Sequence, residues 1–280
     1  MFEKEIINWF KKNKRDLPWR NTDAWGVLVS EFMLQQTPVN RVLPVWEAWM
    51  KKWPTPKDLA KAKKSEVIKS WGRLGYPRRA LRLYETAKII SEKYQGSIPK
   101  TIIELRELPG VGEYTAAAIY SFAFGKRALV LDTNIRRVFA RAIDGKEIAA
   151  LTLNNKERGK REKLIPKEAS LWAAATMELG ATICTAKSPQ CEICPISQFC
   201  VWRFKGYPKS RAPKRKSQSW HGTDRQCRGT ILNYLREKDR GTKSQFEKLW
   251  SDKKQLEKAL KSLEIDGLIE KRGKSFTLAS

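Results

Sequence analysis

The chain has 280 residues, of which 41% are hydrophobic and 31% charged, and its mean hydropathy is −0.56. This length can bury one sizeable core and carry a second, smaller domain, and no apolar run approaches the roughly 20 residues that cross a membrane. Fifty-six basic residues against 30 acidic ones give a net charge of +26, which favours a polyanionic partner through counterion release. A generally basic proteome, or solubility alone, is the alternative explanation of this charge.

Residues 1–206 predict a mostly helical domain, because apolar residues recur there at three- and four-residue spacing. The periodic segments are Ile6–Phe10, Val27–Leu34, Leu81–Ile90, Thr115–Phe124 and Ala169–Leu179. Proline and glycine turns separate them, and no alternating run is long enough for a sheet. The first 16 residues mix charges with apolar residues and lack the continuous apolar stretch of a signal peptide, which indicates a cytoplasmic protein.

Glu31 lies in the segment Ser30–Thr37, on a predicted helix that is otherwise apolar. A carboxyl group in such surroundings has a raised pKa and can act as a general acid near neutral pH. Taken alone, this glutamate is better explained as a solvated residue on the outer face of the helix.

The run Leu108-Pro109-Gly110-Val111-Gly112 falls between two predicted helices, Thr101–Leu105 and Tyr114–Phe124. A glycine-rich hairpin between helices lets backbone N–H groups approach a DNA phosphate. The alternative is a plain helix–helix turn.

Asp132 opens the segment Leu131–Arg137, about twenty residues after the hairpin. A carboxylate there could stabilise the positive charge that develops on a sugar during glycosidic bond cleavage. It could equally be the N-cap of the next helix, and the two roles are compatible.

Four of the five cysteines, Cys184, Cys191, Cys194 and Cys200, follow the pattern C-x6-C-x2-C-x5-C. Four thiolates at this spacing can hold one metal centre, and the spacing alone leaves zinc and a 4Fe–4S cluster both open. Cys227 stands apart as an ordinary thiol.

The C-terminal part contains a basic segment and a small domain. Residues 203–219 carry seven basic residues and no acidic one, so they are expected to lie against DNA phosphates or stay mobile. Helices at Arg225–Leu235, Ser244–Trp250 and Lys254–Ile265, followed by a hairpin over 268–278, predict a winged-helix module.

These motifs, in this order and spacing, closely resemble the helix–hairpin–helix DNA glycosylase superfamily and, within it, the MutY-type adenine glycosylases. The resemblance covers residues 1–206 almost continuously, including Leu17-Pro18-Trp19-Arg20 and the run from Trp71 to Tyr76. The cysteine spacing matches the 4Fe–4S loop of this superfamily, which selects the iron–sulfur cluster over zinc.

The resemblance implies a mostly α, two-lobed fold with a cluster loop, and the pattern of the remaining residues adds a small winged-helix-like C-terminal domain. Its six-helix lobe would span 20–132, and its iron–sulfur lobe would combine 1–19 with 133–206. A basic linker would follow at 207–219, and the winged-helix-like domain would fill 220–280.

The implied reaction is removal of adenine paired with 8-oxoguanine or guanine from double-stranded DNA, by a monomer. Glu31 would protonate the adenine, and Asp132 would stabilise the oxocarbenium ion. Asn134 and Tyr114 would hydrogen-bond Asp132 or the reacting centre and keep the carboxylates in place. Endonuclease III has a lysine nucleophile at the position of Tyr114, so hydrolysis without strand cleavage is expected here.

The implied DNA contacts come from two further places. Gln36 and Tyr76 would insert into the base stack around the opposite base, and the hairpin Gly110, Val111 and Gly112 would bind the phosphate backbone.

Two alternative functions remain open: a thymine or uracil mismatch glycosylase, and a non-catalytic DNA-binding regulator. The large C-terminal domain of many MutY proteins is replaced here by a short tail like that of actinobacterial members, which leaves recognition of 8-oxoguanine open.

Overall fold

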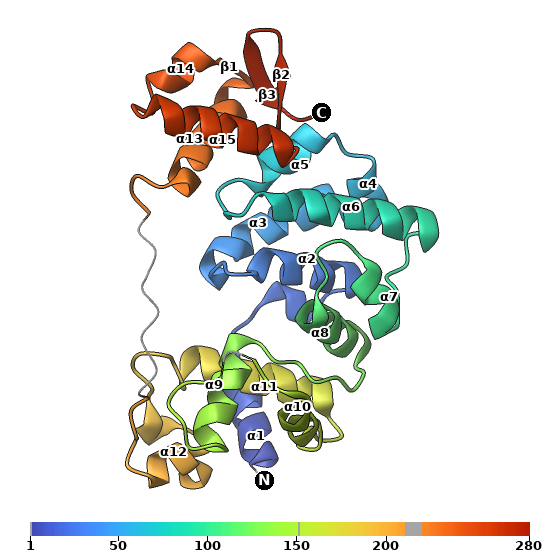
Figure 1. Ribbon diagram of the computed structural model, residues 1–280. Helices are drawn as coiled ribbons and strands as arrows, with labels where there is room; N and C mark the ends of the chain where they lie inside the picture. Colours follow the sequence, from blue (N-terminus) through green and yellow to red (C-terminus); the bar gives the residue numbers. More distant parts are fainter. Residues whose placement is uncertain (1, 151, 211–219) are drawn as a thin grey trace. The chain divides into compact units, whose positions relative to one another are not determined.

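A computed structural model of the protein describes residues 2–150, 152–210 and 220–280 (Figure 1). The chain forms two compact units, and one of the divisions falls inside α2 (Ala24–Leu34). The first unit consists of Met1–Val27, Lys100–Arg106 and Val111–Lys214, and the second of Leu28–Pro99, Glu107–Gly110 and Arg215–Ser280. The mostly helical fold predicted from the sequence is confirmed, and all strands in the described ranges lie between residues 240 and 278. Within those ranges, no helix combines the length and apolar character needed to cross a membrane.

The first unit is built around α11 (Ala169–Thr182), which is buried along most of its length. Helix α1 (Glu3–Asn13) packs its apolar residues Ile6, Ile7 and Phe10 into the same core, so the start of the chain lies against a helix distant in sequence. The unit also contains α7 (Ile102–Glu107), α8 (Glu113–Phe124), α9 (Thr133–Ala142), α10 (Asn155–Glu162), α12 (Val201–Phe204) and 3₁₀ turns at Pro18–Arg20, Cys191–Ile193 and Ser197–Phe199.

Gly180 allows α9 to approach α11 closely. A Cβ atom at this position would lie 2.7 Å from the Cβ of Asn134 and 2.9 Å from its carbonyl oxygen. Because backbone cannot yield as a flexible side chain can, any larger residue at 180 would push the start of α9 away. The close approach therefore fixes where Asp132 and Asn134 lie against α11.

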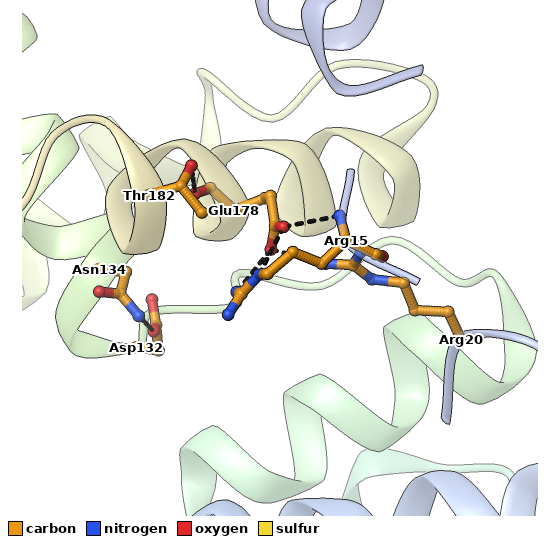
Figure 2. Close-up of polar contacts among 6 residues, drawn as sticks. All are labelled: Arg15, Arg20, Asp132, Asn134, Glu178 and Thr182. Carbon is orange, nitrogen blue, oxygen red and sulfur yellow. Dashed lines mark hydrogen bonds and ion pairs between the residues drawn. The ribbon is translucent and has the colours of Figure 1, made fainter. Parts of the chain in front are cut away.

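Glu178, on the same helix, fixes the segment that follows α1 (Figure 2). Its carboxylate is 1% exposed and accepts hydrogen bonds from Arg15 Nε (2.7 Å), the Arg15 backbone N–H (3.0 Å) and Arg20 Nη2 (2.8 Å). Burial opposes ionisation of Glu178, but the hydrogen bonds from Arg15 and the charge of Arg20 outweigh it and lower its pKa to about 2. The Leu17-Pro18-Trp19-Arg20 motif is thus held to the core by its arginine.

The second unit begins with the rest of α2 and continues as a helical layer. Its members are α3 (Val39–Lys52), α4 (Pro56–Ala60), α5 (Lys64–Trp71) and α6 (Arg78–Lys93). Trp49 and Trp71 are fully buried, with ring centroids 5.5 Å apart in an edge-on arrangement, and they join α3 to α5.

The C-terminal domain forms the rest of this unit (Figure 1). It consists of α13 (Asp224–Lys238), β1 (Arg240–Thr242), α14 (Lys243–Glu247), α15 (Lys253–Ile265), β2 (Ile269–Arg272) and β3 (Ser275–Leu278). The predicted hairpin is the β2–β3 pair, and β1 adds to β3 so that the sheet order is β1-β3-β2, all antiparallel. Its core is shared with Ile68 of α5 and Leu81 of α6, so the domain is packed onto the helical layer.

The basic segment predicted at 203–219 is described only as far as residue 210. Residues 211–219 lie outside the described ranges. At its start, Arg203 belongs to α12, and Trp202 Nε1 donates to the Pro208 carbonyl over 3.0 Å. Its first residues therefore lie against the first unit.

We predict that Glu178→Gln destabilises the first unit by about 3 kcal/mol at pH 7, because the native-state pKa of Glu178 lies well below the ordinary value of 4.5. A depressed carboxyl pKa stabilises the fold above pH 4.5, and this contribution is lost as the pH falls towards 2. Urea unfolding between pH 7 and pH 3 measures both effects.

The matched control is Glu107→Gln, which removes an exposed ion pair with Lys93 and should leave the free energy of unfolding close to that of wild type. Equal unfolding free energies for the two variants, with the same pH dependence as wild type, would contradict the assignment of Glu178.

Candidate active site

Asp132 is the N-cap residue of α9 (Figure 2). Its Oδ1 accepts the backbone N–H of Ile135 over 2.6 Å, and its Oδ2 accepts Asn134 Nδ2 over 2.7 Å. The carboxylate therefore lies at the positive end of a helix, with both oxygens hydrogen-bonded. The capping role that the sequence left open is present, and it fixes the side chain in one orientation.

Burial raises the pKa of Asp132 above its ordinary value, while hydrogen bonds from Ile135 and Asn134 and the nearby Arg137 charge act in the opposite direction. A half-buried carboxylate held by N–H donors is little screened by water. Such a group interacts strongly with a cation that forms beside it, which is what cleavage of a glycosidic bond requires.

Arg137 connects this carboxylate to the cysteine loop. Its Nη2 donates to Asn134 Oδ1 (2.7 Å) and to the carbonyl of Gly180 (2.6 Å), and its Nε donates to the carbonyl of Cys184 (2.6 Å). Asn134 is therefore fixed on both sides of its amide, with the nitrogen on Asp132 and the oxygen on Arg137. No role for Arg137 was predicted from the sequence, although its position one helical turn after Asn134 places the two side chains on the same face.

Glu31 lies on α2 in the second unit and is 6% exposed. Its neighbours along the helix, Leu28, Val29, Phe32 and Met33, are all buried. The interpretation as a solvated surface glutamate is therefore wrong. The residue is the buried carboxyl group that the apolar run predicted.

The hairpin between α7 and α8 needs glycine at 110 for two reasons. Gly110 has φ of +83°, and a Cβ there would lie 2.8 Å from Phe32 Cε1. Thr86 Oγ1 donates to the carbonyl of Pro109 over 2.8 Å and holds the turn to α6.

The second glycine of the hairpin has a different setting. Gly112 is the N-cap of α8 and has open space where a Cβ would be. The N-terminus of α8 thus begins without a side chain at its cap, as close approach of a phosphate requires. Val111 is buried beside it, and Tyr114, in the first turn of α8, packs partly buried against the core of the first unit.

Gln36 and Tyr76 both have left-handed backbone conformations, with φ of +56° and +46°, and both are exposed. Strained non-glycine residues of this kind concentrate at functional sites. The buried Arg79 holds the two turns together, because its guanidinium donates to the carbonyls of Phe32 (2.9 Å) and Gln35 (2.5 Å) in one turn and Gly75 (3.0 Å) in the other. Burial lowers the pKa of Arg79 to about 10, so it is charged at neutral pH.

The four clustered cysteines line one small cavity in the first unit. Among the described residues no three His, Cys, Asp or Glu side chains converge as the ligands of a single ion do. Burial raises the pKa of Cys194 to about 11. Arg141 Nη1 lies 3.4 Å from Cys184 Sγ and places a positive charge beside the thiols. The donor set and this charge fit an anionic thiolate-bound group.

Two family models match the chain. Residues 29–160 match the HhH-GPD superfamily of base excision DNA repair proteins, and residues 184–200 match the iron–sulfur binding domain of endonuclease III. The second match begins and ends at cysteines of the cluster, and the iron–sulfur cofactor predicted from their spacing is confirmed.

Several curated proteins resemble this chain over most of its length. The adenine DNA glycosylase of Mycolicibacterium smegmatis is 46% identical over 272 residues, which are 95% of this chain and 92% of that protein. The adenine DNA glycosylase of Mycobacterium tuberculosis is 44% identical over 94% of this chain and 88% of its own length. The human adenine DNA glycosylase is 40% identical over 71% of this chain and 39% of its own length.

Among solved structures, a thermostable thymine-DNA glycosylase matches with a TM-score of 0.65 at 31% identity, covering 73% of this chain and 95% of its own. Endonuclease III in a non-covalent DNA complex matches with a TM-score of 0.62 at 25% identity, covering 73% and 94%. The helix–hairpin–helix glycosylase fold predicted from the sequence is confirmed.

We predict that Cys191→Ser removes the iron–sulfur cluster or most of it. Wild-type protein purified without air should contain about four iron atoms per chain and little zinc, and the variant should lose the visible absorption and unfold at a lower temperature. Iron analysis and absorption spectroscopy measure this directly.

Cys227→Ser is the matched control, because Cys227 is buried in the C-terminal domain within the second unit. It should retain full iron. Stoichiometric zinc in the wild type, or full iron in the Cys191 variant, would contradict the ligand assignment.

Proposed function

We propose that this chain, which belongs to the adenine DNA glycosylase family within the HhH-GPD superfamily, removes adenine from duplex DNA by hydrolysing its N-glycosidic bond. The observation that carries the proposal is the Asp132 carboxylate, fixed through both oxygens at the N-terminus of α9. An abasic site in an otherwise intact strand is the product.

The chemistry divides between two carboxyl groups. Glu31, buried on α2, donates a proton to N7 of adenine, so the base leaves with the electron pair of the bond between C1′ and N9. The sugar becomes an oxocarbenium ion, which the Asp132 carboxylate stabilises. Water then adds to C1′ and gives a proton to the Glu31 carboxylate. Asn134 fixes Asp132 during these steps, and Tyr114 lies at the reacting centre.

The substrate is double-stranded DNA with adenine opposite 8-oxoguanine or guanine, bound by a monomer in the cytoplasm at the nucleoid. The adenine leaves the base stack before it reacts. The backbone of Gly110, Val111 and Gly112 binds a phosphate, and Gln36 and Tyr76 enter the stack around the opposite base. The net charge of +26 supports such a partner.

Cys184, Cys191, Cys194 and Cys200 hold the 4Fe–4S cluster, which stabilises the loop around it. Arg137 links the loop to the active site, because it donates hydrogen bonds to both the Cys184 carbonyl and the Asn134 side-chain amide. Release of thymine or uracil is the second candidate, and it is not favoured, because the relatives that cover most of this chain are named for adenine.

We predict that Asp132→Asn lowers the single-turnover rate of adenine release by about a thousandfold or more, because the charge opposite the oxocarbenium ion is lost. Asparagine is as good an N-cap as aspartate, so the melting temperature and the affinity for duplex DNA should stay close to those of wild type. Asp132→Ser, which also caps but is shorter, serves as the matched control and should be equally inactive. If Asp132→Asn kept a tenth or more of the wild-type rate of adenine release, Asp132 would be only a helix cap and not a catalytic residue.

A further inference from the structure

A groove of about 1100 Å³ lies within the second unit, between α13 and the turns that carry Gln36 and Tyr76. Arginines line it on both sides, and no aspartate or glutamate is among the described residues of its wall. No step of the proposed reaction uses α13, so this wall of the groove has no assigned role.

The groove has a fixed shape because α13 is packed onto the helical layer. Ile231 and Leu232 of α13 share a buried core with Ile68 and Leu81. Arg236 Nε donates to the carbonyl of Ile68 over 3.3 Å, which adds a polar contact at the same junction. The C-terminal domain is therefore a wall of the groove and belongs to the same compact unit.

The positive charge of the groove is only partly neutralised. Arg78 and Arg228 both pair with Asp266, at 3.4 and 2.5 Å. In the part of the chain that the structure describes, Arg73 and Arg225 form no salt bridge, and both are exposed. These two guanidinium groups can bind an anion without giving up an acidic partner.

Aromatic rings lie beside these charges. Tyr76 and Trp220 are 46% and 48% exposed, which is unusual for side chains of this size. The Arg225 guanidinium lies 5.3 Å from the ring centre of Trp220, and its Nη1 donates to the Tyr76 hydroxyl over 3.2 Å. Exposed aromatic rings next to arginines are typical of surfaces that bind a nucleic acid strand, because bases stack on the rings and phosphates pair with the guanidinium groups.

We propose that this groove binds the DNA strand opposite the extracted adenine, with Trp220 and Tyr76 contacting its bases and Arg73 and Arg225 its phosphates. The inference rests on the proposed function, which assigns Gln36 and Tyr76 to the opposite base. It adds that the C-terminal domain, through Trp220 and α13, forms part of the site that senses that base.

The test measures binding of full-length protein to three duplexes with a reduced abasic site in place of the adenine nucleotide. The position opposite holds guanine, 8-oxoguanine or a second abasic site. Trp220→Ala should weaken binding roughly five- to hundredfold when a base is present, and should have little effect when none is. Trp220→Phe keeps a ring and should restore most of the affinity.

Arg225→Ala should weaken binding to all three duplexes and reduce the salt dependence by a slope of about 0.9, as expected for one lost phosphate contact. The matched control is Arg240→Ala, an exposed arginine of the same domain outside the groove, which should bind like wild type. Correct folding of every variant is checked by melting temperature and iron content.

This inference would be overturned if the Trp220 and Arg225 variants bound all three duplexes with the same affinity as the Arg240 variant. A wild-type protein that releases no adenine would instead overturn the proposed function, so the two failures are distinguishable. A Trp220 defect of the same size without an opposite base would mean that the ring does not contact it.

Discussion

The candidate active site depends on one constraint: a carboxylate must be kept charged and fixed while it is largely removed from water. Asp132 is fixed as the N-cap of α9, where the helix end and the Asn134 amide hydrogen-bond both oxygens and oppose the rise in pKa that burial causes. Two neighbouring residues, Gly180 and Arg137, hold Asp132 in that position. Gly180 lets α9 lie close to α11, and Arg137 joins Asn134 to the cysteine loop. The iron–sulfur loop thus acts as a structural support of the carboxylate, because the loop supplies an acceptor to the arginine that positions Asn134.

The second unit uses a buried arginine for a similar purpose. Arg79 satisfies carbonyl groups in two separate turns, and these turns carry Gln36 and Tyr76 in strained conformations. Removing a guanidinium from water costs free energy, and the carbonyl oxygens around it offset that cost. The C-terminal domain packs onto the same layer, so the residues assigned to the opposite base and the wall formed by α13 belong to one fixed surface.

Much of this could be read from the sequence because it depends on neighbouring residues. Helical spacing located the long helices, cysteine spacing located the cluster loop, and the apolar run around Glu31 indicated its burial. What the sequence did not reveal depends on partners far apart in the chain. Glu178 and Arg15 are separated by 163 residues and Arg79 and Phe32 by 47, so no local pattern marks those side chains as buried. Strand β1 was missed because only three residues, between two helices, pair with β3.

The proposed reaction hydrolyses the N-glycosidic bond of adenine in duplex DNA without cutting the strand. The most direct measurement is single-turnover base release from adenine:8-oxoguanine, adenine:guanine and thymine:guanine duplexes, with the product strand analysed before and after alkali. We expect free adenine from the first two duplexes and no thymine from the third. Strand breaks should appear only after alkali, because the resemblance implies a tyrosine, Tyr114, in place of the lysine nucleophile of endonuclease III. Release of thymine with adenine left in place, or strand cleavage without alkali, would contradict it.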